Sequence, residues 1–323
     1  MKDKLKIDIG QLKGVKKGAR ATVFVMKYYV LIVIGYIVLY PLLYMVSNAF
    51  KGEKALVDVS LIWIPKYLST KWFNEAFDII SFGDSLKRTF SLQILSAAIE
   101  VIVCAVIAYG FARFNFKGKK IATVFLVLSF MIPLPMYGMS LAVNYRSLDF
   151  LGIFGLIDRF TGVDLRFNIF NTNWSFWLPS LLGVGIRSGM MIYIYIQFFI
   201  GLPAELEDAA YVDGAGAIRT FVSIAIPSSS VVILTVSVLS FIWHWNETYL
   251  SALCLLDENW PLSVQMMNIK QKLVQAGMFL ESTPRAGPIV FCACLLFIMI
   301  PLVLYLLIQR KFVASIDRVG ITG

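Results

Sequence analysis

Long apolar runs dominate the sequence, and polar residues gather in the segments between them. Each run is close to the roughly 20 residues that an α-helix needs to cross the hydrocarbon core of a bilayer. The pattern therefore predicts an all-α polytopic membrane protein with six transmembrane helices. The expected spans are roughly 22–50, 86–112, 121–145, 178–200, 229–255 and 288–309.

Several of these runs contain proline, which removes a backbone donor and bends a helix. Pro41 lies in the first run, Pro133 and Pro135 in the third, and Pro301 in the sixth. In a membrane protein, neighbouring helices can satisfy the backbone groups that a proline frees. We therefore expect kinks at these positions rather than breaks.

One sizeable polar insert also has a strong helical pattern, and it runs from Leu202 to Pro227. Pro203 is suited to the first turn of a helix, and Gly214 stands where a glycine commonly ends one. Acids in a first turn complement the positive end of the helix dipole. Three acids occupy that turn: Glu205, Glu207 and Asp208.

The same insert has a face of mostly small residues at helical spacing. Leu206, Ala209, Ala210 and Asp213 share this face, which another protein could approach closely. The insert thus indicates a docking helix on a membrane protein. The alternative is an ordinary amphipathic helix in the membrane interface, against which three acids would sit poorly beside anionic lipid.

Composition supports the membrane assignment. The 323 residues are 59% hydrophobic and 15% charged, with a mean hydropathy of +0.76, whereas soluble domains are about half apolar and a quarter charged. The formal net charge is +9, but the basic residues lie at the ends of apolar spans and form no groove interleaved with aromatics. Nucleic-acid binding is therefore not expected.

The distribution of Lys and Arg predicts the orientation. Fifteen lie in the segments that are cytoplasmic if both termini are inside, and ten lie in the longer segments on the other side. The positive-inside rule thus places both termini and the 202–227 insert in the cytoplasm. The expected domains are a basic N-terminal tail (1–21), a six-helix transmembrane domain (22–309) that contains the insert, and a C-terminal tail (310–323). The N-terminal run is too long for a cleaved signal peptide, so we expect it to be retained.

Few residues are suited to metal or redox chemistry. The cysteines lie in or beside apolar runs, and the C-x-C spacing at 292–294 is not that of a zinc or redox motif. We expect them to be packing residues, and a single histidine, His244, cannot form a multi-histidine metal site. The cysteines are Cys104, Cys254, Cys292 and Cys294.

The polar insert resembles the EAA loop of ABC importer permeases. That loop has an EAA triplet, a glycine four residues after the last alanine, and an I-x-L-P ending. Here the triplet is Asp208, Ala209 and Ala210, the glycine is Gly214, and the ending is Ile224–Pro227. Asp208 replaces glutamate and Ile226 replaces leucine, and both changes keep charge or hydrophobicity.

Three further stretches resemble carbohydrate permeases similar to the maltose permease subunits. Ala108–Phe114 (AYGFARF) is similar to the AYAFARF-type end of their second span, and Trp245–Asn246 to a WN pair in their fifth. Gln309–Phe312 with Val319–Gly323 resembles the QR…GxxxG tail that inserts between two ATPases. Thr322 stands where that tail has its last lysine.

The resemblance implies a type I ABC importer in the bacterial cytoplasmic membrane. Its implied partners are a second homologous permease subunit, two ABC ATPase subunits, an extracytoplasmic solute-binding protein, a sugar or oligosaccharide substrate and the lipid bilayer. The fragment Gly214-Ala-Gly216 is not a phosphate-binding loop, because no G-x-x-x-x-G-K-[ST] follows a strand. ATP and Mg would therefore be bound by the partners, and this chain would be neither an enzyme nor the carrier of a cofactor.

Two sets of site residues follow. The set expected to couple to the ATPases comprises Glu205, Glu207, Asp208, Ala209, Ala210, Asp213, Gly214 and Pro227. Ionisable and aromatic groups within spans are candidates for a substrate path, namely Arg187, Trp245, Asn246, Glu247 and Tyr249. Mid-span Glu100 is a further ionisable group, and all these groups could instead pair with one another or with the partner permease.

The 256–287 loop lies where the resembling subunit contacts the binding protein, and a solvated connector is equally possible. Its amphipathic residues predict a short helix that projects outward, and shortening 273–281 is expected to abolish transport while leaving assembly intact.

An importer of peptides, amino acids or ions would have a similar EAA loop. A secondary carrier would need coupling-ion sites, and an intramembrane enzyme would need more than His244 beside Glu247. The sequence does not identify the sugar, the partner permease, the ATPase or the subunit that holds the sugar.

Overall fold

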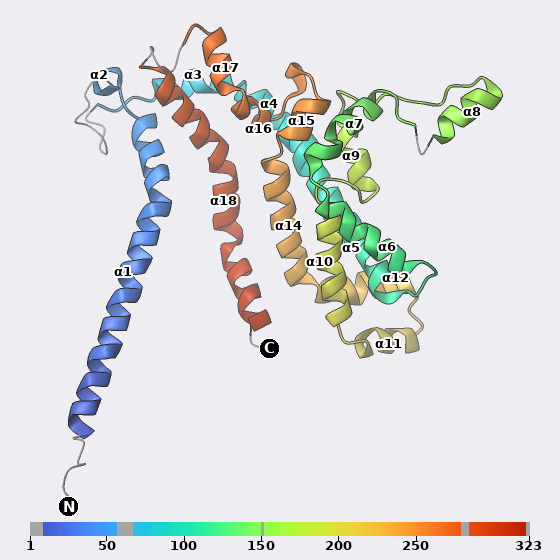
Figure 1. The fold of residues 1–323 in the computed structure, drawn as a ribbon, viewed down its shortest axis with the longest axis horizontal. Helices are drawn as coiled ribbons and strands as arrows, with labels where there is room; N and C mark the ends of the chain where they lie inside the picture. The colour runs from blue at the N-terminus through green and yellow to red at the C-terminus, as the bar shows by residue number, and fades with distance from the viewer. Residues whose placement is uncertain (1–8, 57–66, 150–151, 279–283, 321–323) are drawn as a thin grey trace, which may run out of the picture. The chain divides into compact units, whose positions relative to one another are not determined.

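A computed structural model describes residues 9–56, 67–149, 152–278 and 284–320. Within these ranges the chain is built of helices, with isolated β-bridges at Lys51–Leu68 and Leu148–Phe167 and no strand. The all-α prediction is confirmed, and Figure 1 shows the helices in chain order.

The chain divides into two compact units, which are described separately. The first unit comprises residues 1–74 and 280–295, and the second comprises residues 75–279 and 296–323. Helix α18 (Ala286–Gly320) contributes its first turns to the first unit and the remainder to the second.

The first unit is built around α1 (Ile9–Ala49), a single helix that continues through Pro41. At its C-terminal end, the Cys292 thiol of α18 donates a hydrogen bond to the Ala49 carbonyl (3.3 Å). The Trp72 indole donates to the Lys51 carbonyl (2.6 Å) and is fully buried. The short helices here are α2 (Glu53–Leu56) and the start of α3 (Lys71–Ile79).

The second unit is organised around α5 (Leu95–Arg113), which packs against α10 (Ser188–Gly201), α14 (Ser230–Trp245) and α9 (Trp174–Leu181). Small residues on α5 allow the neighbouring helices to approach closely. Together these helices bury Cys104, Ala105, Ala108, Tyr109, Met191, Ile192, Tyr195, Ile196, Phe199, Ala225, Val232 and Val236. The helix α4 (Phe82–Arg88) and a π-helical turn (Thr89–Ile94) lead directly into α5.

The third predicted span is broken rather than kinked, so the expectation for Pro133 was wrong. Helix α6 (Lys119–Met131) and α7 (Leu134–Arg146) meet at 99°. Ile132 is extended (φ −76°, ψ 119°), as a residue before proline tends to be. Pro135 lies in the first turn of α7, where its missing donor costs little. Pro301, in contrast, lies inside the continuous α18.

The fourth and fifth predicted spans are also interrupted. Residues 182–187 separate α9 from α10, and both Gly183 (φ +71°) and Arg187 (φ +58°) adopt left-handed backbone there. A side chain at Gly183 would collide with Ile107 of α5, so this break packs directly on α5. In the fifth predicted span, α14 ends at Trp245, and the chain becomes helical again in α15 (Tyr249–Cys254).

The remaining helices are short. Two of them, in the 256–287 loop, bury Leu262, Val264, Ile269 and Leu273, so residues 256–278 pack onto the second unit rather than forming a solvated connector. The short elements are α8 (Ile153–Thr161), α11 (Glu205–Val212), α12 (Ala217–Thr220), a π-helical turn η2 (Phe221–Ala225), α13 (Ile226–Ser228), a 3-10 turn (Asp257–Asn259), α16 (Leu262–Met267) and α17 (Ile269–Gln275).

Three stretches of the described chain are long and apolar enough to cross a membrane as single helices. A further three bent pairs raise the number of crossings to as many as six. The bent pairs are α6 with α7, α10 with α11, and 217–228 with α14. The single helices are Thr22–Ala49, Phe82–Arg113 and Ala286–Arg310.

Candidate functional site

The candidate docking helix is α11, which lies across the end of α10 at a bend of 76° (Figure 1). Leu202 is extended before Pro203, and the helix then begins with the Ala204 carbonyl accepting from the Glu207 and Asp208 amides (both 2.9 Å). Glu205, Glu207 and Asp208 all lie in its first turn. The acids thus stand at the positive end of the helix dipole, where they stabilise it.

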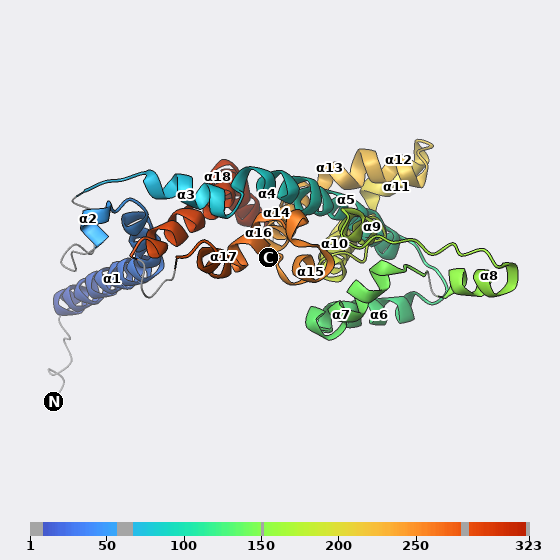
Figure 2. The same ribbon diagram turned by 90° about the horizontal axis from the view of Figure 1, so that it is seen from above.

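Gly214 ends α11 through two backbone hydrogen bonds. The Gly214 amide donates to the Tyr211 carbonyl (3.0 Å), and the Ala215 amide donates to the Ala210 carbonyl (2.9 Å). This pair of bonds is the Schellman arrangement, which needs left-handed backbone after the helix. Gly214 has a φ of +82°, which glycine adopts without steric cost. The turn sends the chain into α12 beside α11, as Figures 1 and 2 show.

The predicted docking face of α11 is exposed except at Ala210. Ala210 (8% exposed) and Glu207 (5% exposed) are buried against this chain itself. Both side chains therefore contact the rest of this chain, and their role in coupling to the ATPases stays a prediction. The outward residues are Leu206 (48% exposed), Val212 (87% exposed), Glu205, Asp208, Ala209 and Asp213.

Glu207 connects α11 to α5. Its Oε1 accepts a hydrogen bond from Arg113 Nε (2.8 Å), and its Oε2 accepts one from the Tyr109 hydroxyl (3.2 Å). Arg113 Nη2 also donates to the Leu202 carbonyl (3.1 Å). Removing one partner of such a buried pair commonly costs about 3–5 kcal/mol, because the other charge is left unpaired.

Pro227 lies beyond α12, in the three-residue helix α13, and is exposed. The π-helical turn Phe221–Ala225 precedes it. Proline has no backbone N–H to donate to the preceding turn, and the π-helical turn accommodates this missing hydrogen bond. The chain bends by 80° between residue 228 and α14, so Pro227 marks where the insert re-enters the helical bundle.

The residues predicted to line a substrate path differ in their exposure. Trp245 is 1% exposed and stacks between Phe241 and Phe297 (ring centroids 5.7 and 5.3 Å). Arg187 lies at the start of α10, with its guanidinium 5.3 Å from the Trp243 ring. Trp245 therefore belongs to the packing of the chain and not to an open surface, whereas Arg187 is exposed.

Glu247 is a helix cap. Its Oε1 accepts from the Leu250 amide (2.9 Å), and its Oε2 accepts from the amide and the hydroxyl of Ser251 (both 3.0 Å). Both oxygens thus accept hydrogen bonds within the chain and the side chain is buried, while substrate contact by Glu247 stays a prediction. Asn246 and Tyr249 remain exposed; Tyr249 packs so closely on Gly138 of α7 that a Cβ there would lie 2.7 Å from its ring.

Glu100 lies in a buried polar cluster that joins α5, α10 and α14. One carboxyl oxygen accepts from the Ser188 hydroxyl, and the other lies 3.5 Å from His244 Nε2. His244 Nδ1 lies 2.9 Å from the Ser240 carbonyl. Glu100, Ser188, Ser240 and His244 are at most 1% exposed. The cluster therefore connects three helices in the bundle interior.

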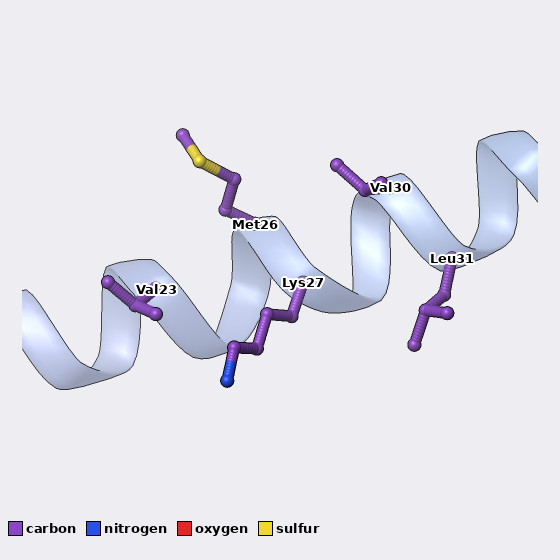
Figure 3. Close-up of a pocket in the computed structure, with 5 residues that line it drawn as sticks. All are labelled: Val23, Met26, Lys27, Val30 and Leu31. Atoms are coloured by element: carbon purple, nitrogen blue, oxygen red, sulfur yellow. The ribbon is translucent and has the colours of Figure 1, made fainter.

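Figure 3 shows a groove on one face of α1. Its five lining residues all belong to that helix, so it is a surface between side chains rather than an enclosed cavity. They are Val23, Met26, Lys27, Val30 and Leu31. We do not assign this groove to the substrate.

A surface ion-pair group lies between α8 and α9. Arg166 contacts Asp158 and Asp164 (both 2.8 Å). The hydrogen bond from the Arg166 side chain is the main reason that the pKa of Asp164 lies below its usual value. Exposed pairs of this kind contribute little to stability, and in the described residues no group of His, Cys, Asp and Glu is arranged to hold a metal ion.

Comparison with known proteins decides the family. Residues 101–318 match the model of the binding-protein-dependent transport system inner membrane component. The chain belongs to this family. The match covers α11, the Gly214 turn and the Arg113–Glu207 pair. This permease is a multi-pass membrane transport component rather than an enzyme.

Named relatives resemble the permease over most of its length. The probable ABC transporter permease protein YurM of Bacillus subtilis is 28% identical over 88% of this chain and 84% of its own. The galactooligosaccharides transport system permease protein GanQ of the same organism is 25% identical over 92% and 94%. The sn-glycerol-3-phosphate transport system permease protein UgpE of Yersinia pestis is 24% identical over 84% and 85%.

A solved structure shows the same fold. The permease superposes on a chain of a bacterial ABC transporter involved in the import of the acidic polysaccharide alginate, with a TM-score of 0.67 and 15% identity. The alignment covers 91% of this chain and 97% of the other. The type I importer fold implied by the EAA resemblance is thereby confirmed.

Two residues of the site were not singled out from the sequence. Arg113 and Tyr109 were recognised only as part of the AYGFARF stretch, and their contact with Glu207 spans more than 90 positions in the chain. A signal was present, because the basic end of one span and the acidic insert were both predicted to lie on the cytoplasmic side. Only the fold shows that they meet.

Proposed function

We propose that this permease is one transmembrane subunit of an ATP-driven importer that receives sugars or oligosaccharides from a solute-binding protein. The observation that carries the proposal is α11, a short acidic helix held by its inward face and exposed on its outward face. An exposed, rigidly held helix at the end of a membrane bundle is suited to docking into another protein. The family match supports this use.

The proposed assembly contains a second homologous permease, two ATPase subunits that bind ATP and Mg, and an extracytoplasmic binding protein. Most side chains of α1 from residue 22 to residue 43 are exposed in this chain. Apolar side chains on a spanning helix need lipid or another subunit to cover them. The second permease and the bilayer would do so.

The proposed mechanism is alternating access. Closure of the ATPases on ATP would move α11, and the bent pairs of the bundle would rearrange to open the path to the other side. Both termini and the 202–227 insert would lie in the cytoplasm of a bacterium, as the distribution of Lys and Arg predicts. The tails 1–21 and 310–323 would flank the permease domain there.

Sugar is the cargo that the relatives favour. GanQ is named for galactooligosaccharides, and another relative of Bacillus subtilis, MelC, is named as a melibiose/raffinose/stachyose import permease. UgpE is named for sn-glycerol-3-phosphate, which supports a second candidate, a phosphorylated polyol rather than a sugar. Arg187, Asn246 and Tyr249 are the exposed residues proposed for the path.

Co-purification tests the proposed function. The tagged chain, purified in mild detergent, is expected to bring down a second permease and an ATPase. The ATPase rate of this complex should rise with a sugar-loaded binding protein, and the sugar that stimulates it identifies the cargo. A chain that purifies alone, or an ATPase that responds to sn-glycerol-3-phosphate and to no sugar, would contradict the sugar assignment.

A further inference from the structure

We propose that Arg113 and Tyr109 are positioning residues that hold α11 at a fixed angle to α5 through Glu207, so that movement of α11 is passed to the transmembrane helices. We name Tyr109, Arg113 and Glu207 the brace. This inference rests on the proposed function, because it describes how the docking helix would act on the bundle.

The brace joins three elements. Both Glu207 oxygens are occupied by α5 side chains, at 2.8 Å from Arg113 Nε and at 3.2 Å from the Tyr109 hydroxyl. Arg113 Nη2 donates in addition to the carbonyl of Leu202, the residue that ends α10. The planar guanidinium therefore holds the end of α10 and the first turn of α11 with one rigid group.

The position of Tyr109 is itself fixed by packing. Its ring lies 5.5 Å from Phe199 and 4.8 Å from Phe221, between ring centroids, and 6.2 Å from Phe114. These rings belong to α10, to the π-helical turn after α12, and to the end of α5. Because the ring is held from three sides, its hydroxyl is aimed at Glu207, and the residue is only 4% exposed.

A lever needs a stiff connection at its base. The backbone of α11 packs mainly on α12 and the π-helical turn, which belong to the same insert. The brace connects it instead to α5, the helix that packs on α9, α10 and α14. A force on the outward residues Leu206 and Val212 would therefore reach the bundle through Glu207. Without the brace, α11 could tilt while the bundle stayed in place.

A purely stabilising role is the alternative, since a buried ion pair can also hold a fold without transmitting motion. The two roles differ in what they change. Loss of stability lowers the amount of complex and reduces ATP hydrolysis and uptake together. Loss of transmission leaves the ATPase running while the uptake per ATP hydrolysed falls.

The test uses the complete complex in proteoliposomes with its loaded binding protein. The variants are Arg113→Gln, Glu207→Gln, their double variant and Tyr109→Phe, and Lys117→Gln is the control. Lys117 is exposed and lies in the same basic connection between α5 and α6, so the control removes a like charge without touching the brace. ATP hydrolysis, uptake and complex yield are measured for each.

We expect the uptake per ATP to fall by about two- to thirtyfold in Arg113→Gln and Glu207→Gln, with a smaller fall in Tyr109→Phe. The uptake per ATP of the double variant should be no lower than that of the less active single variant, because the two residues act as a pair. Arg113→Lys keeps the positive charge but loses the planar guanidinium, so its uptake per ATP should lie between those of Arg113→Gln and the wild type. Lys117→Gln should match the wild type.

An unchanged uptake per ATP in the Gln variants would overturn the inference. If those variants fail to assemble, Tyr109→Phe decides, because it keeps the ring packing and removes only the hydroxyl; a wild-type ratio in Tyr109→Phe would then overturn it. Failure of the proposed function looks different. In that case the wild-type chain itself would show no ATP-dependent uptake.

Discussion

At the scale of single residues, three buried carboxyl groups show how this chain accommodates polar side chains inside a mostly apolar fold. Glu207 is paired with Arg113, Glu247 caps α15, and Glu100 faces Ser188 and His244. Burying a polar group is costly unless it has hydrogen-bond partners. Position in a span was enough to identify Glu100 and Glu247 as unusual, and a place in a helix first turn singled out Glu207. The roles of Glu207 and Glu247 depend on contacts that only the fold reveals.

Gly214 allows a residue-scale prediction with a matched control. Gly214→Ala places a side chain on left-handed backbone, at a cost of about 1–2 kcal/mol, although no neighbouring atom lies within 4 Å of the added Cβ. Gly216 is equally open but has a φ of −79°. We expect Gly214→Ala to lower the thermal stability of the complex and its uptake per ATP.

Gly216→Ala should leave both quantities unchanged or slightly improved, because alanine reduces the entropy of the unfolded chain. Thermal unfolding followed by size-exclusion chromatography, with coupled ATPase and uptake assays, measures the difference. Equal behaviour of the two variants would show that the left-handed turn is not needed to hold α11.

At the scale of elements, hydrophobic runs predicted where helices occur better than how each helix is divided. The first and last runs became single helices through Pro41 and Pro301. The third run broke at Pro133, because Ile132 before the proline adopts extended backbone and ends the helix. The break at 182–187 carries no proline but contains Gly183, which adopts left-handed backbone there. Its close packing on Ile107 of α5 is a tertiary contact that the local pattern does not show.

The docking helix was predicted correctly as an element, with its acids and its terminal glycine, because capping and turn chemistry are local. Its exposed face was predicted in part. The i, i+3, i+4 pattern placed Leu206, Ala209 and Asp213 on that face, and they are exposed, whereas Ala210 turns inward with Glu207. An eight-residue helix with few large side chains does not specify which side is buried.

The 256–287 loop gives a prediction at the element scale. Leu273 is fully buried whereas Val274 is 48% exposed at the end of α17, so a deletion of 273–281 would remove a core residue. Residues 279–281 lie outside the described ranges. The tip is better tested by Val274→Glu. If this loop meets the binding protein, that change should weaken stimulation of the ATPase by about five- to thirtyfold without changing the complex yield.

Leu273→Glu is the contrasting variant. It buries a charge in place of a leucine, and a loss of at least about 2–5 kcal/mol of stability should reduce the yield of complex. Normal stimulation in Val274→Glu would mean that this tip does not contact the binding protein.

At the scale of the whole molecule, the chain is a membrane component built to work with other subunits. Its family is shown by the match over residues 101–318 and its fold by the alginate importer chain. Composition and charge distribution were sufficient to predict a polytopic protein, and one motif was sufficient to predict the transport class. The cargo could not be predicted in the same way, because importers of peptides, amino acids or ions would have a similar EAA loop.

ATP-driven uptake by the reconstituted complex tests the central claim most directly. Proteoliposomes with ATP inside and the binding protein outside are given radiolabelled sugars, with ATP-free vesicles as the control. The account predicts accumulation that requires both ATP and the loaded binding protein. Uptake that proceeds without ATP, or that follows an imposed ion gradient instead, would contradict it.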